Sequence, residues 1–246
     1  MEDIIAGKHA VLEALKSGRA IHKLWIAETM GKQQMSEVAS LAKKQGIAVQ
    51  FADKRKLDQL AGPVRHQGVV AQAAAAQYAE VEDLLSRAAE RGETPFLIIL
   101  DEIEDPHNLG SILRSADCTG VHGVIIPKRR SAGLNATVAK TSAGAVEYVP
   151  VARVTNLAQT MERLKKEGLW IVGADANAAQ EIYAADLTVP LAVVIGNEGE
   201  GIGRLVREKC DLLVKLPMMG RINSLNASVA AAVFMYEIVR QRRVQA

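Results

Sequence analysis

The chain has few cysteines and no long apolar run, and each shortage excludes a class of protein. Cys118 and Cys210 lie far apart and belong to no Cys-x-x-Cys or Cys/His spacing, so we expect neither a disulfide framework nor a metal site. No apolar stretch approaches the roughly 20 residues of a membrane span, and no charged segment leads into an apolar one at the N-terminus. We therefore expect a reduced, cytoplasmic protein without membrane association.

A large excess of charge is also missing. The net charge of the 246 residues is only +2, and the 49% hydrophobic and 24% charged fractions are those of an ordinary globular protein. Any nucleic-acid surface must therefore come from local clusters such as Lys128, Arg129 and Arg130. Each cluster taken alone also fits a solvated surface.

Residues 1–76 have the pattern of a small α/β unit. Helical patterns at residues 8–17, 33–44 and 54–60 alternate with strand patterns at 23–27, 47–51 and 68–75. Residues 77–94 read as a linker, because an apolar helical spacing gives way to the polar sequence ERGETP. We place the second domain at residues 95–246.

In the second domain, apolar strands alternate with helices. We expect strands at residues 96–100, 123–127, 147–151, 169–173, 191–195 and 212–216, with helices at 109–119, 135–141, 157–167, 202–208 and 224–242. Strands that are apolar on both faces indicate a parallel sheet covered by helices on each side, as in Rossmann-like α/β folds.

Three polar segments follow apolar strands, which is where α/β proteins build ligand sites. In the first, DPHNLGSILR at residues 105–114, Asn108 is expected to cap a helix. Arg114 falls on the polar face, one turn beyond Gly110, which leaves a side-chain-free patch where an RNA backbone could approach the guanidinium. Taken alone, the segment also fits an ordinary helix with one exposed arginine.

The second segment, IGNEGEG at residues 195–201, resembles a dinucleotide loop, but the spacing fails. After Gly199 and Gly201, the third glycine of G-x-G-x-x-G would fall at Arg204, and no Walker lysine follows. The glutamates would also repel a pyrophosphate. A ligand with a positive centre fits the loop better, and a dehydrogenase is disfavoured.

The third segment, LPMMG at residues 216–220 followed by NSLNAS at 223–228, supplies an apolar wall and then a helix start. Ser224 and Asn226 are expected to open the last helix, whose first N–H groups could hold an anion.

The three segments, in this order, resemble the signature motifs of the SpoU (TrmH-like) RNA ribose 2′-O-methyltransferases. The resemblance implies a SPOUT-type Rossmann-like domain with a trefoil knot, an L30e-like substrate-binding domain at residues 1–76 and S-adenosylmethionine as cofactor. Knots are nearly absent from proteins, so this expectation depends on the resemblance alone.

The resemblance also implies the site residues. Catalytic positions are Asn108, Arg114, Glu198, Ser224 and Asn226, and cofactor-binding positions are Gly196, Leu216, Met218 and Leu225. The arginine of the family has been proposed as the general base. Because its pKa exceeds ~12, we favour Arg114 as an electrostatic activator of the ribose hydroxyl, with His107 as the conventional alternative base.

The expected partners are RNA and a second copy of the chain. Within the family, the likeness is greatest to the bacterial enzyme that methylates a guanosine of the peptidyl-transferase region of 23S rRNA, with a homodimer through the C-terminal domain. A tRNA guanosine 2′-O-methyltransferase and an inert RNA-binding or ribosome-assembly protein are the alternatives. The candidate RNA-binding residues are Lys54, Arg55, Lys56, Lys128, Arg129 and Arg130.

Overall fold

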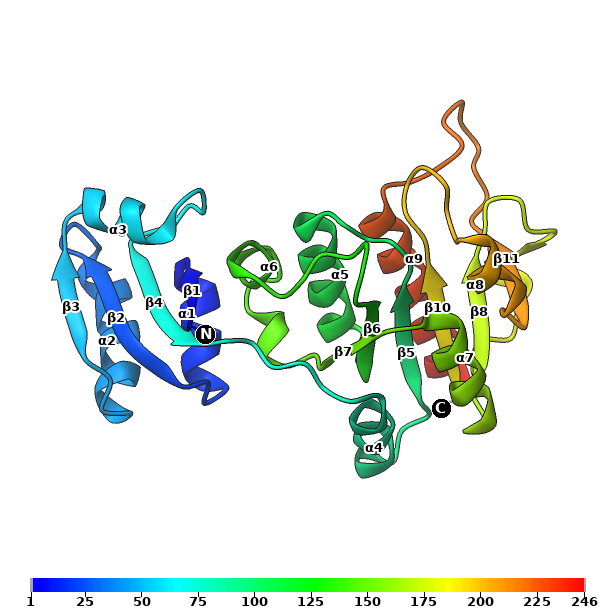
Figure 1. The fold of residues 1–246 in the computed structure, drawn as a ribbon, viewed down its shortest axis with the longest axis horizontal. Coiled ribbons are helices and arrows are strands. Elements are labelled where there is room, and N and C mark those ends of the chain that lie inside the picture. Colours follow the sequence, from blue (N-terminus) through cyan, green and yellow to red (C-terminus); the bar gives the residue numbers. More distant parts are fainter. Residues whose placement is uncertain (1, 246) are drawn as a thin grey trace. The chain divides into compact units, whose positions relative to one another are not determined.

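The computed structural model describes the backbone of residues 2–245 and the side chains of residues 3–31 and 35–244. The chain forms two compact units (Figure 1). The first contains residues 2–77 together with residues 133–148, and the second contains residues 78–132 and 149–245.

The first unit is the expected small α/β domain. Its elements up to residue 77 are β1 (Glu2–Ala6), α1 (Lys8–Lys16), β2 (Ile21–Ala27), α2 (Lys32–Lys44), β3 (Val49–Ala52), α3 (Lys54–Ala61) and β4 (Val69–Ala74). The sheet order is β1-β4-β2-β3, in which only β2 and β3 pair in parallel. Successive side chains of a strand point to opposite faces. Ile26 therefore packs in the cluster of α1 and α2, and Trp25 packs in the cluster of α3.

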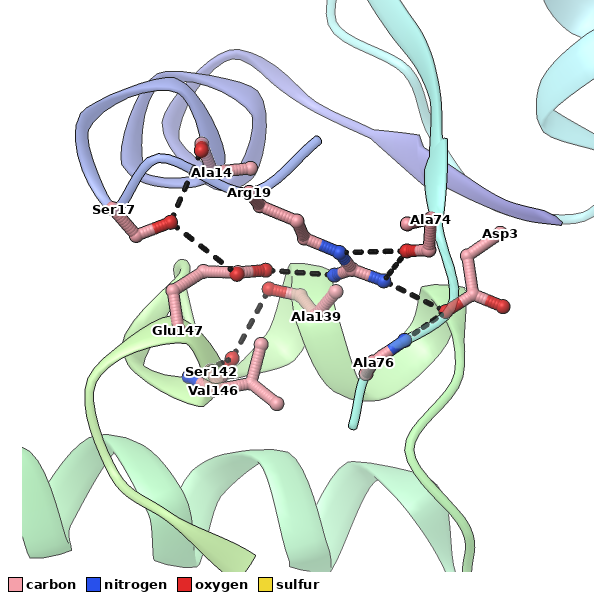
Figure 2. A network of polar contacts seen from close by, with 10 residues as sticks. All are labelled: Asp3, Ala14, Ser17, Arg19, Ala74, Ala76, Ala139, Ser142, Val146 and Glu147. Atoms are coloured by element: carbon pink, nitrogen blue, oxygen red, sulfur yellow. Dashed lines mark hydrogen bonds and ion pairs between the residues drawn. The ribbon is translucent and has the colours of Figure 1, made fainter. Parts of the chain in front are cut away.

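Residues 133–148 complete the first unit, although we expected them in the second domain. They form α6 (Ala136–Thr141) and the 3-10 helix η1 (Ala145–Glu147). The guanidinium of the partly buried Arg19 donates to Asp3 Oδ2 at 2.7 Å and to Glu147 Oε1 at 2.8 Å (Figure 2). The Tyr148 hydroxyl donates a hydrogen bond to Glu13 Oε2 at 2.6 Å. The expected strand at 147–151 is therefore wrong, because its first residues are held in this polar network.

The second unit contains a seven-stranded sheet in the order β7-β6-β5-β10-β8-β11-β9. Its elements are α4 (Val81–Arg91), β5 (Phe96–Leu100), α5 (Pro106–Cys118), β6 (Gly123–Pro127), β7 (Val151–Val154), α7 (Leu157–Lys166), β8 (Trp170–Ala174), β9 (Gln180–Glu181), the 3-10 helix η2 (Ile182–Ala184), β10 (Leu191–Ile195), α8 (Arg204–Glu208), β11 (Leu212–Lys215) and α9 (Ala227–Gln245). Every strand pair is parallel, as the apolar strands predict.

Helices cover both faces of this sheet. Alternate residues of β5 and β10, such as Leu97 and Val194, pack with α4, α7 and α8 in one core cluster, while α5 and α9 pack against each other (Figure 1). The expected linker at 77–94 differs from the structure, because α4 buries Val81, Leu84 and Ala88 in the second unit. A fragment that begins at residue 95 would expose that core.

Candidate active site

The three polar segments meet at the carboxyl edge of the parallel sheet. β5 leads into residues 101–108, β10 into residues 196–203 and β11 into residues 216–226. Because β5 and β10 are hydrogen-bonded neighbours in the middle of the sheet (Figure 1), their carboxyl ends lie side by side. The strand order runs from β5 to β7 on one side and continues with β8 on the other, and such a reversal of strand order creates a crevice at the carboxyl ends of the strands.

Glu198 is the centre of a hydrogen-bond network that joins all three segments. Its Oε1 accepts from Asn108 Nδ2 at 3.0 Å, from the Ala227 backbone N–H at 3.1 Å, and from Asn226 Nδ2. Asn226 Nδ2 also donates to Asn108 Oδ1 at 2.9 Å. The carboxylate thus lies at the N-terminus of α9, where the helix dipole favours negative charge.

The neighbouring helix starts differ from the expectation in two places. Asp105, not Asn108, caps α5, because its side chain accepts from the His107 N–H at 2.8 Å and Pro106 occupies the first turn. Asn108 is therefore free to face Glu198. The last helix begins at Ala227 rather than Ser224, since Asn226 Oδ1 accepts from the Ser228 N–H at 3.0 Å.

A cavity of about 340 Å³ opens beside this network. Its walls come from the carboxyl ends of β8, β10 and β11 and from the first turns of α9. The four predicted cofactor-binding residues all line this cavity: Gly196, Leu216, Met218 and Leu225. Glu198 and Ser224 line it as well. Apolar walls suit an adenine ring, and the carboxylate of Glu198 suits a positive sulfonium, so this lining fits S-adenosylmethionine.

Gly196 is required by the backbone that folds over it. A Cβ on this residue would lie 2.1 Å from the carbonyl carbon and oxygen of Gly201, far inside van der Waals contact. Asn197 and Gly201 close the loop through paired backbone hydrogen bonds of 3.2 and 3.1 Å, and Asn197 Oδ1 accepts from the N–H groups of Gly199 and Glu200. The loop is therefore shaped by its own contacts.

Asp101 also holds this loop, and sequence reasoning missed it. The side chain is buried, and its Oδ2 accepts from the Gly203 N–H at 2.8 Å, which ties the end of β5 to the start of α8. Burial raises the pKa of the Asp101 carboxyl above its usual range, while the Gly203 N–H lowers it. The sequence signal that could have identified Asp101 is its place as a carboxylate directly after five apolar strand residues.

Arg114 lies on the exposed face of α5, as expected, but outside both the network and the cavity lining. The patch expected beside it is wrong, because Gly110 is buried. An RNA backbone could therefore approach the guanidinium only from its solvent side.

The predicted RNA-binding residues are exposed and belong to both units. Lys54, Arg55 and Lys56 form the first turn of α3, and residues 128–130 follow β6. Arg130 is paired with Glu102 at 2.8 Å, whereas Lys128 and Arg129 form no ion pair with any residue whose side chain the structure describes.

Among the described residues, no three His, Cys, Asp or Glu side chains group as a metal site would require. Within the same residues, no helix combines the length and the apolar character of a membrane span.

Comparison with known proteins gives the family. Residues 95–236 match the model of the SpoU rRNA Methylase family, and residues 4–79 match that of the RNA 2′-O ribose methyltransferase substrate-binding domain. YacO of Bacillus subtilis, which is named for the TrmH family of tRNA/rRNA methyltransferases, is 58% identical over 98% of this chain and 96% of its own. A relative from Staphylococcus aureus, also named for the TrmH family of tRNA/rRNA methyltransferases, is 53% identical over 98% of each chain.

A solved structure agrees with the fold. The SpoU methyltransferase AviRb from Streptomyces viridochromogenes, in complex with the cofactor AdoMet, superposes with a TM-score of 0.82, at 26% identity, over 100% of this chain and 92% of its own. The two family models cover both units, and the network of Asn108, Glu198 and Asn226 lies beside a cavity that fits this cofactor. The chain therefore belongs to the SpoU rRNA methylase family of S-adenosylmethionine-dependent RNA methyltransferases.

Proposed function

We propose that the protein methylates the ribose 2′-hydroxyl of a guanosine in the peptidyl-transferase region of 23S rRNA. The observation that supports this most is the position of Glu198, which binds Asn108 and Asn226 and also lines the candidate cofactor cavity. This arrangement would present a fixed carboxylate, together with its two amide partners, to a hydroxyl that meets the cofactor in the cavity.

Each residue of the candidate site has a role in methyl transfer that follows from its side-chain chemistry. The cofactor supplies a methyl group on a sulfonium, and its transfer to oxygen needs in-line alignment of the hydroxyl. The three network bonds to Glu198 all end on Oε1, so Oε2 stays available to accept the hydrogen bond of a ribose hydroxyl. Arg114 would stabilise negative charge on that oxygen as the proton is lost. Leu216, Met218 and Leu225 would hold the adenine.

Two alternatives are tested together with the proposal. The relatives are named for tRNA and rRNA alike, so a tRNA guanosine is the runner-up substrate. An inert RNA-binding or ribosome-assembly protein would need no intact network, and Asn108, Glu198 and Asn226 are all in place. An rRNA substrate also implies a cytoplasmic location.

The substrate is tested by methylating defined RNAs with the purified protein. With S-adenosylmethionine, we expect 2′-O-methylguanosine in 23S rRNA fragments and not in tRNA, measured by mass spectrometry of nuclease digests. The Glu198→Ala variant, which removes the carboxylate, is the control. Methylation of tRNA alone would establish the runner-up, and methylation of neither RNA, with 23S rRNA still bound, would support the inert protein.

We also propose a homodimer through the second unit, supported by an uncovered apolar face on α9. Val229 and Tyr236 are about half exposed, and Tyr183 from η2 joins them. A shallow cavity of about 380 Å³ lies among Tyr183, Val233 and Tyr236. Exposed apolar patches of this kind mark interaction sites.

The dimer is tested by light scattering at micromolar concentration. We expect the mass of two chains for the wild-type protein and of one chain for Tyr236→Glu, because a charge at the centre of a buried interface is costly. Phe51→Glu, which changes an equally exposed aromatic residue of β3 in the first unit, should stay dimeric. A fully active monomer would contradict the proposal.

A further inference from the structure

A second cavity lies at the carboxyl edge of the same sheet, over the ends of β6 and β7. Its volume is about 620 Å³, and it is lined mainly by polar side chains from the segments after these strands and from α7. The cations on its wall are Lys128, Arg153, Arg163 and Lys166.

The charges of this cavity do not cancel. Each of its three carboxylates is engaged: Glu82 pairs with Arg163, Glu162 pairs with Lys209 at 3.1 Å, and Glu80 takes part in the capping box of α4. Lys128, Arg153 and Lys166, by contrast, form no ion pair with any side chain that the structure describes. The cavity therefore presents three unpaired positive charges to solvent.

Arg153 is held in place although it is exposed. Its Nη2 donates to the Lys128 carbonyl oxygen at 3.0 Å, and its guanidinium lies over the ring of Tyr78, 5.3 Å from the ring centroid. Because the Arg153 guanidinium is already held in place, its side chain loses little conformational entropy when it binds a phosphate. Nucleic-acid grooves combine such cations with aromatic rings.

The cavity is close to the candidate active site along the sheet edge. β6 lies between β5 and β7, and neighbouring strands are about 4.8 Å apart. The end of β7 is therefore about 10 Å from the end of β5, which leads into Asn108. When the ribose of the target nucleotide lies at Glu198 and the RNA runs along the sheet edge towards β7, the adjacent nucleotides of the RNA lie over this cavity.

We propose that this cavity binds the phosphodiester backbone of the RNA that flanks the target nucleotide, with Arg153 and Lys166 contacting phosphates. The proposal rests on the proposed RNA methylation and adds a site for substrate binding that takes no part in the methyl transfer itself. Its ligand is the sequence-independent backbone, because exposed cations match the charge of phosphates and provide no base-edge code.

The test is the double variant Arg153→Ala/Lys166→Ala of the full-length protein. Both side chains are exposed, so the fold should be kept. We expect RNA affinity to fall on the order of tenfold, and the slope of log affinity against log salt to decrease by about 1.4 for two lost contacts to single-stranded RNA. KM for RNA should rise while kcat and the affinity for S-adenosylmethionine stay unchanged.

The matched control is Arg243→Ala. This exposed arginine follows Arg242, which donates to the carbonyl groups of Thr94 and Pro95 at the amino edge of the sheet. The Arg243→Ala substitution removes a positive charge from the same unit at a position outside the cavity, so RNA binding should not change. Equal affinity and equal salt slope for the double variant and the wild type would overturn the inference. If the wild-type protein methylates no RNA, the proposed function fails instead.

Discussion

Replacing Arg114 by alanine should lower the rate of methyl transfer by on the order of 10²–10³-fold, the usual effect of losing one group that stabilises transition-state charge. The side chain lies on the exposed face of α5 and packs into no core cluster, so the fold and the cofactor affinity should be unchanged. Single-turnover methylation with saturating RNA measures the rate, and calorimetry with S-adenosylmethionine measures the affinity.

Two further variants separate charge from geometry and from proton transfer. Arg114→Lys should stay slow, because a point charge does not reproduce the guanidinium fork. His107→Ala should keep most of the activity, since its side chain lies on the exposed first turn of α5. Near-wild-type turnover by Arg114→Ala would refute the role of the arginine. A loss of about a thousandfold for His107→Ala would make the histidine the general base.

The regular elements of the second unit were predictable because each has a strong local signal. The strands at residues 96–100, 123–127 and 191–195 coincide with β5, β6 and β10, since a short apolar run flanked by polar or turn residues defines a buried parallel strand. The strand after residue 147 was misplaced because Glu147 and Tyr148 are held by Arg19 and Glu13. No periodicity contains such contacts between distant residues.

The division into units needed the same long-range information. Residues 133–148 lie in the middle of the predicted second domain, yet Gly144, with φ +91°, packs so closely on Glu13 of α1 that a Cβ would lie 2.5 Å from the Cβ of Glu13. Residues 81–88 keep the amphipathic spacing of a helix, but the polar sequence after them led us to predict a linker for residues 77–94, where the structure has α4. The knot stays a prediction of the resemblance.

The candidate site shows what motifs can and cannot predict. The positions of Asn108, Glu198 and Asn226 followed from resemblance, and the structure brings them within hydrogen-bond distance across 118 residues of chain. Asp101 and Arg153 carry no motif, because their roles depend on the Gly203 N–H and on the Tyr78 ring. Such partners become visible only when the strands are paired.

Replacing Gly196 by alanine should reduce the affinity for S-adenosylmethionine by at least about a hundredfold. The new Cβ would lie 2.1 Å from the backbone of Gly201 and 2.4 Å from the Ile202 N, so residues 197–201 must move away from β10. That movement displaces Glu198 from the cavity wall and strains the bonds to Asn108 and Asn226. Overpacking of this kind costs typically 1–3 kcal/mol or more.

The matched control lies in the same loop. A Cβ at Gly199 would meet only Asn197 Oδ1 at 3.5 Å, an ordinary contact, and its backbone is not left-handed, so Gly199→Ala should bind the cofactor within a few-fold of the wild type. Calorimetry measures both affinities, and thermal melting without cofactor shows whether each variant is folded. If Gly196→Ala is folded and binds as tightly as Gly199→Ala, then the loop can open away from Gly196 at little cost. The cofactor cavity would in that case not depend on the close approach of Gly196 and Gly201.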